Sequence, residues 1–167
     1  MVKDALAAAR TQEEENVVYY GPILDASPPL SVYTASSCAK AGRADAKAGC
    51  GVYWGESNHR NKGAPVPGGQ SDARAALYAI TLAILTAPTY RTLTVYSPSQ
   101  YAIRSFCYWV GENATRGWPC KHADIIRVGA EYLRARRAAV SFCWVDKSQG
   151  SPNMHLASAQ ALAKSAA

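Results

Sequence analysis

The sequence has few acidic side chains, no long apolar run and no pair of closely spaced cysteines. Its 167 residues include 12 acidic and 18 basic side chains. No apolar stretch approaches the roughly 18 residues that a transmembrane helix requires. The first residues also lack a basic start followed by an apolar core, which argues against a secretory signal. We therefore expect an intracellular, soluble protein with one main domain and no membrane partner.

The cysteines and histidines give no metal-binding pattern. There are five cysteines, an odd number, and no two have the C-x-x-C spacing that is typical of zinc sites. His122 and His155 are isolated along the chain, with no second ligand at metal-binding spacing. The sequence therefore predicts no metal ligand among these residues and no cofactor.

Negative charge is concentrated at the start of the chain. Residues 1–30 carry two basic and five acidic side chains, whereas residues 31–167 carry 16 basic and seven acidic ones, a net charge of +9. A basic domain indicates a polyanionic partner such as nucleic acid, although many basic proteins bind none. Seven acidic residues are also few for an enzyme that depends on carboxylates.

Turn signals and periodicity divide the chain into a flexible acidic leader, residues 1–29, and one domain, residues 30–167. The Ser-Pro-Pro break at 27–29 closes the leader. Alternating apolar residues predict strands at 30–34, 49–55, 62–66, 92–96 and 139–145. Capped apolar segments predict helices at 72–86, 123–136 and 154–166. A further helix is predicted to begin at Ser97 as N-cap and to run to Trp109, followed by a loop over 111–122. This order predicts an α/β fold with a mixed sheet.

Five blocks of sequence resemble, in order and spacing, those of ribonuclease H, particularly the forms associated with fungal retroelements. They are VYTASSC at 32–38, AGCGVYWG at 48–55, GGQSDARAALYAI at 68–80, LTVYSPSQYAI at 93–103 and ALAK at 161–164. The resemblance implies the ribonuclease H-like fold, an α/β fold in which α-helices flank a five-stranded mixed β-sheet.

The resemblance also implies a site for two magnesium ions, with which the family cleaves the RNA strand of an RNA/DNA hybrid. Two hard cations close together need several anionic oxygens, which the family supplies from four carboxylates beside a mobile histidine. Here the carboxylate positions hold Ala35, Ala76, Pro98 and Gln160, and the histidine position falls on Gly150, or on Ser148 in a different alignment. No acidic residue follows Asp146, so shifting the alignment cannot restore the last carboxylate.

These replacements predict a catalytically inactive member of the family, not an enzyme. Asp72 lies one turn before Ala76, but one carboxylate cannot hold two ions, and its expected role is to cap the helix and interact with its dipole. Engineering would hardly explain Pro98 and Gln160, so natural loss is favoured. The expected function is a protein-interaction or scaffolding module with an unknown protein partner. The alternatives are a binder of RNA/DNA hybrid or double-stranded RNA that does not cleave it and, least favoured, a residual hybrid ribonuclease.

Nucleic-acid binding depends on residues outside these four positions. The family reads the minor groove with two asparagines, which are here replaced by Asp72 and Ala73. Each remaining candidate has a structural alternative, such as a helix surface for Arg74, packing for Trp109 and a solvated face for the arginines of 127–137. The candidates are Gln70, Arg74, Ser99, Gln100, Trp109, Arg127, Arg134 and Arg137. The opposite charges of leader and domain also suggest the hypothesis that the leader folds back on the domain.

Overall fold

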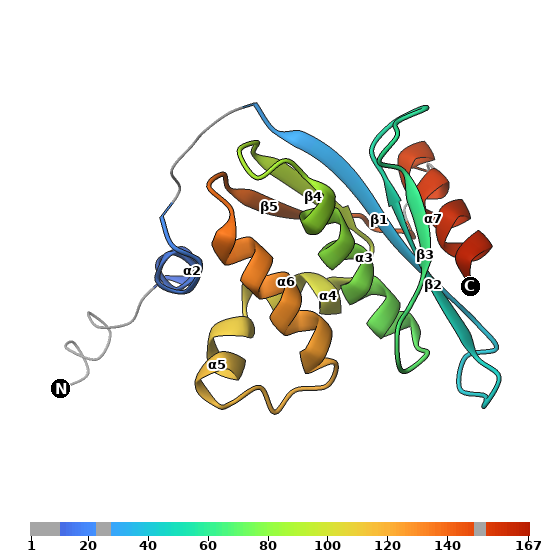
Figure 1. The fold of residues 1–167 in the computed structure, drawn as a ribbon, viewed down its shortest axis with the longest axis horizontal. Helices are drawn as coiled ribbons and strands as arrows, with labels where there is room; N and C mark the ends of the chain where they lie inside the picture. Colours follow the sequence, from blue (N-terminus) through green and yellow to red (C-terminus); the bar gives the residue numbers. More distant parts are fainter. Residues whose placement is uncertain (1–10, 23–27, 149–152) are drawn as a thin grey trace.

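A five-stranded mixed sheet forms the centre of the fold (Figure 1). The computed structural model describes residues 11–22, 28–148 and 153–167, so the predicted histidine position Gly150 lies outside the described residues. The strands lie in the order β3-β2-β1-β4-β5, with antiparallel pairs β1–β2 and β2–β3 and parallel pairs β1–β4 and β4–β5. This confirms the predicted sheet. Its strands are β1 (Leu30–Ala39), β2 (Lys47–Tyr53), β3 (Lys62–Pro65), β4 (Leu93–Ser97) and β5 (Val140–Trp144).

Helices cover both faces of the sheet. Three of them, α3 (Asp72–Thr86), α4 (Gln100–Cys107) and α6 (Ala123–Ala135), lie on one face, and α7 (Met154–Ala166) lies on the other (Figure 1). A short helix, α5 (Val110–Thr115), replaces part of the expected loop, and an ion pair between Glu112 and Arg116 at its end supports it. Among the helices of the described residues, none has both the length and the hydropathy needed to cross a bilayer.

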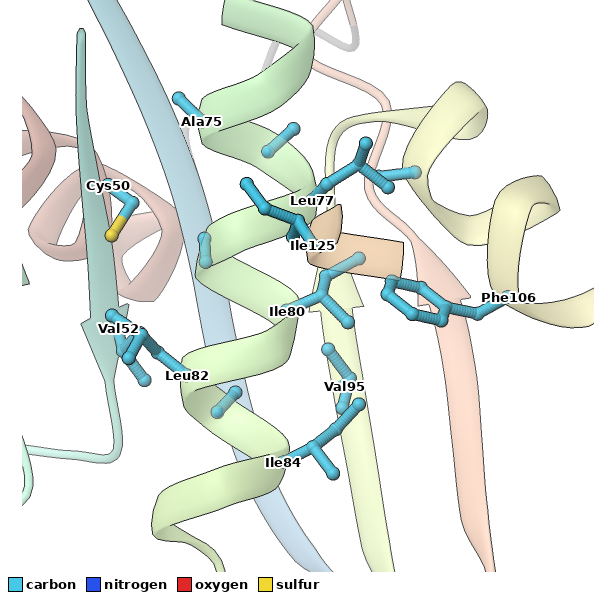
Figure 2. Close-up of a cluster of buried hydrophobic side chains, with 14 of the residues drawn as sticks. Cys50, Val52, Ala75, Leu77, Ile80, Leu82, Ile84, Val95, Phe106 and Ile125 are labelled. Carbon is cyan, nitrogen blue, oxygen red and sulfur yellow. The ribbon is translucent and has the colours of Figure 1, made fainter. Parts of the chain in front are cut away.

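Alternation along β1 separates two hydrophobic clusters. Successive side chains of a strand point to opposite faces, so Val32 joins the larger cluster and Ala35 joins the smaller one beneath α7. The larger cluster surrounds α3, between Cys50 and Val52 of β2 on one side and Phe106 of α4 on the other (Figure 2). α3 is buried around most of its circumference, as its continuous apolar pattern predicts.

Glycines in the sheet allow α7 to approach it closely. A Cβ atom at Gly51 would lie 2.0 Å from the Ala159 carbonyl oxygen, and one at Gly49 would lie 2.4 Å from the Ala163 carbonyl oxygen. Because both distances are far shorter than a van der Waals contact, the backbone of α7 rests directly on β2. α7 therefore covers the half of the sheet that β1, β2 and β3 form.

Serine side chains begin α3 and α4. The Ser71 hydroxyl accepts a hydrogen bond from the Arg74 backbone N–H at 3.2 Å, which confirms the predicted start of α3. The predicted cap of α4 is wrong by two residues, because Ser99, not Ser97, accepts from the Ala102 N–H. Ser97 is the last residue of β4 and is 1% exposed, so the strand extends through the position where we expected the helix to begin.

Part of the expected leader forms helix α2 (Gln12–Tyr20). It begins with a capping box, in which the side chains of Thr11 and Glu14 each accept a hydrogen bond from the backbone of the other residue. The Tyr20 hydroxyl donates to the Phe106 carbonyl at 2.6 Å, and Gln12 Nε2 donates to the Cys107 carbonyl at 2.8 Å. These two bonds attach α2 to the end of α4.

Candidate functional site

Two of the four positions expected to hold carboxylates meet where α7 crosses β1. Ala35 is 2% exposed and packs against Ala159 and Ala163 of α7. Gln160 reaches the next residue of β1, and its Nε2 donates a 2.7 Å hydrogen bond to the Ser36 carbonyl. An apolar contact and a neutral hydrogen bond therefore stand where the motif resemblance implies two carboxylates.

Pro98 follows β4 at the same end of the sheet as Ala35. Tyr33 of β1 lies opposite Tyr96 of β4, so Ala35 and Pro98 each come two residues after this pair. The indole N–H of Trp144 donates to the Pro98 carbonyl at 3.3 Å. This bond joins the ends of β4 and β5. At this position Pro98 therefore supplies a backbone carbonyl, whereas the motif resemblance implies a side-chain carboxylate.

Ala76, the fourth position, is buried in the hydrophobic core around α3. It is 5% exposed and belongs to the larger cluster around α3, whereas Ala35 belongs to the cluster beneath α7. Asp72 is exposed in the first turn of α3. Because the Ser71 side chain provides the cap, Asp72 keeps only the favourable interaction of its charge with the helix dipole.

The residues at these positions do not fit a pair of magnesium ions. In the described part of the chain, no three His, Cys, Asp or Glu side chains lie close enough together to hold a metal ion. Gln160 Oε1 is buried and has no hydrogen-bond partner among the described residues. One neutral oxygen does not replace the several anionic oxygens that two ions require. No chemical step through metal ions follows from this arrangement.

A row of aromatic rings lies on the same face of β1 as Ala35. The rings of Tyr33 and Tyr96 stack with their centroids 4.5 Å apart and an interplanar angle of 9°. The centroid of the His155 ring, on α7, lies 5.1 Å from the ring centroid of Tyr33 and 5.9 Å from that of Tyr53. Our sequence reasoning missed this row, although each tyrosine falls in a predicted strand and cross-strand neighbours of this type stabilise sheets.

Gln70 and Ser99, two of the predicted nucleic-acid contacts, are bonded to the backbone of the chain. Gln70 Oε1 accepts from the Ala48 N–H at 2.6 Å, and its Nε2 donates to two carbonyls of the loop between β3 and α3, each at 2.8 Å. Ser99 uses its hydroxyl as the cap of α4. Both side chains thus shape the loops that lead into α3 and α4.

Arg74, a third candidate, points inward and joins α3 to α6. It is 8% exposed, and its Nε donates to the Pro67 carbonyl at 2.7 Å. Its two terminal nitrogens bond both oxygens of the Asp124 carboxylate, Nη1 at 2.9 Å. These bonds hold the pKa of Asp124 below its ordinary value. Burial, and then the positive charge of Arg74, lowers the pKa of His122.

Gln100 and Trp109 present side-chain surface to the solvent. Gln100 is exposed at the first position of α4. Trp109 stands at the junction of α4 and α5, is 40% exposed, and has its ring centroid 6.1 Å from that of Tyr101. The amide of Gln100 and the ring of Trp109 are therefore open to a ligand.

The predicted basic region divides into exposed and buried arginines. Arg127, Arg134 and Arg137 are exposed, and the guanidinium of Arg134 lies 5.1 Å from the ring centroid of Tyr19 in α2. Arg136 is 9% exposed and donates to the Arg91 carbonyl at 2.6 Å, and burial lowers its pKa. Arg136 therefore supports the fold, and the other three form the exposed basic surface of this region.

Comparisons with known proteins match most of the predicted domain. The family model described as RNase H matches residues 27–167. Ribonuclease H1 of Mus musculus is 37% identical over 89 residues, which are 52% of this chain and 31% of that protein. Ribonuclease H of Schizosaccharomyces pombe is 31% identical over 118 residues, which are 66% of this chain and 44% of that protein. The match thus spans less than half the length of each relative.

Solved structures share the fold at lower identity. The crystal structure of LC9-RNase H1 superposes with a TM-score of 0.65, covering 84% of this chain and 72% of that one. The sequence identity is 21%, so this likeness shows the arrangement of strands and helices and not the chemistry of the site.

Proposed function

The chain belongs to the ribonuclease H family, and from this membership we propose that the ligand of its domain is an RNA/DNA hybrid. The observation that carries the proposal is the family match across residues 27–167, which include the whole sheet and the helices that flank it. Within the family, we propose the branch associated with retroelements, which the blocks at 32–38 and 93–103 support.

Family membership corrects the function predicted from the sequence. We expected a protein-interaction or scaffolding module, because four carboxylate positions hold other residues. The two relatives are a ribonuclease H1 and a ribonuclease H, and neither match points to a protein partner. The same matches contradict the prediction of a non-enzyme, because the family and both relatives are ribonucleases. The comparisons favour the nucleic-acid alternative.

The proposed contact surface begins on α4 and its junction with α5. A protein distinguishes RNA from DNA mainly by its 2′-hydroxyl groups and by the shape of the wide, shallow minor groove. The exposed amide of Gln100 offers both a donor and an acceptor, which suits a 2′-hydroxyl group. The exposed part of the Trp109 ring offers an apolar face to a sugar or a base.

Exposed arginines at α6 supply the proposed contacts to phosphate. Arg127, Arg134 and Arg137 are all exposed, and residues 31–167 carry a net charge of +9. Each arginine that neutralises a phosphate releases condensed counterions, so affinity falls as the salt concentration rises. Gln70, Ser99 and Arg74 contribute indirectly, because their polar groups hold the loops and helices that support this surface.

A binding titration with the full chain tests the proposal. A fluorescently labelled RNA/DNA hybrid is titrated at low salt, with double-stranded RNA as competitor. We expect saturable binding to the hybrid, and we expect Trp109→Ala to weaken it about tenfold, since stacking on an aromatic ring contributes roughly 1–3 kcal/mol. Tyr90→Ala is the matched control, because Tyr90 is an exposed aromatic residue in the turn before β4.

The same samples distinguish the alternatives. Absence of saturable binding to the hybrid at low salt would contradict the proposal. Preferential displacement of the hybrid by double-stranded RNA would favour the alternative ligand. After incubation with magnesium, a denaturing gel shows whether the RNA strand is cut, and cutting would establish action on the hybrid in addition to binding.

A further inference from the structure

The contact between Gln160 and Ser36 joins α7 to β1 at the position where the family places a metal-binding carboxylate. We infer that this amide bridge fastens α7 to β1 without metal ions and that the positions of Ala35, Ala76, Pro98 and Gln160 do not hold the family's magnesium pair. The inference rests on the residues present and does not depend on the proposed hybrid ligand.

The amide makes a bond that a carboxylate cannot make. Gln160 Nε2 carries protons and donates to the Ser36 carbonyl at 2.7 Å. An ionised carboxylate only accepts hydrogen bonds, so in place of Gln160 it would repel the same carbonyl oxygen. A carboxylate at this position would therefore lose the direct bond to β1 unless a cation lay between them, whereas the amide makes the bond by itself.

The rest of the contact between α7 and the sheet is apolar and close. Ala35 packs against Ala159 and Ala163, so among the described residues a cation beside Ala35 would meet the methyl groups of this cluster. Gly51 of β2 pairs with Ala35 of β1. α7 lies so close to Gly51 that a Cβ atom there would collide with the Ala159 carbonyl. Close packing and the amide bridge thus hold α7 in place.

Thermal unfolding of the full chain tests this inference. We expect the same Tm in EDTA and in millimolar magnesium or manganese. Gln160→Asp should lower the Tm by about 2–4 °C in EDTA, the shift expected when a chain of this size loses one net hydrogen bond. Ala161→Asp is the matched control, because it adds the same charge at the exposed neighbouring position of α7, and it should lower the Tm less.

Two results would overturn the inference. The first is a saturable rise in the Tm of the unaltered chain with magnesium that EDTA reverses. The second is a Gln160→Asp variant that is as stable as Ala161→Asp, which would show that the amide bridge contributes nothing. Failure of hybrid binding would remove the proposed function but would leave these Tm results unchanged, so the two failures are distinguishable.

Discussion

Removing the guanidinium of Arg74 should destabilise the fold and leave hybrid binding nearly unchanged. Arg74 is 8% exposed and donates to the Pro67 carbonyl and to both carboxylate oxygens of Asp124. Hydrogen bonds to charged groups contribute about 1.5–3 kcal/mol. The Asp124 side chain is 65% exposed, so water replaces much of that pairing once Arg74 is gone. We therefore expect Arg74→Ala to lower the free energy of unfolding by about 2 kcal/mol.

Urea unfolding at neutral pH measures this loss, which corresponds to a fall of roughly 4–8 °C in Tm. Arg74→Lys keeps the positive charge but loses the planar guanidinium that bonds both carboxylate oxygens. Its free energy of unfolding should therefore lie between those of the parent and Arg74→Ala. Hybrid affinity is then measured at low temperature, where all three proteins stay folded. Unchanged stability together with a large loss of affinity would show that Arg74 contacts the ligand and does not support the fold.

The same pair sets a pH dependence with a definite sign. Hydrogen bonds from Arg74 lower the folded-state pKa of Asp124 from its ordinary 3.8. The Asp124 carboxylate is therefore protonated at a higher pH in the unfolded chain than in the folded chain. The stabilisation that the pair contributes is present above pH 3.8 and is lost as the pH falls through the folded-state pKa. Asp124→Asn should therefore weaken the loss of stability in acid, measured by urea unfolding across this range.

Three further predictions concern packing, thiol reactivity and charge. Gly51→Ala should lower stability by roughly 2–3 kcal/mol, because its Cβ would lie 2.0 Å from a carbonyl oxygen of α7. Gly111→Ala meets open space within α5 and should raise stability by up to about 1 kcal/mol, and thermal unfolding compares the two variants. The exposed Cys143 should react with iodoacetamide before Cys107, because burial raises the pKa of Cys107 to about 11. Equal rates of modification, measured by peptide mass spectrometry, would contradict this. Arg127→Ala should reduce the slope of log affinity against log salt by about one, and an unchanged slope would remove Arg127 from the phosphate contacts.

The sheet and the long helices were predictable because their signals are local. The alternation at 30–34 reflects a strand that is buried on one face. The continuous apolar character over 72–86 reflects a helix that is buried on nearly all sides. The start of α4 and the helix α5 were not predictable in the same way. Ser97 and Ser99 are equally good caps by residue type, and the choice depends on how far β4 extends along β5, which is a tertiary contact.

The candidate site shows the same limit. Residue identities at Ala35 and Gln160 followed from the motif blocks, but their contacts did not. Gln160 bonds Ser36, 124 positions earlier, and Arg74 bonds Asp124, 50 positions later, and no local pattern encodes such pairs. Gln70, Ser99 and Arg74 were therefore predicted as possible contacts to nucleic acid, although their polar groups are bonded within the chain.

Whether the domain recognises an RNA/DNA hybrid is decided by the ratio of its affinities for the hybrid and for a DNA duplex of the same sequence. Both ligands carry the same phosphates, so measuring them at one salt concentration cancels most of the non-specific attraction to the basic domain. What remains is the contribution of the 2′-hydroxyl groups and of groove shape. We expect tighter binding of the hybrid. Equal affinity for the two duplexes would contradict it.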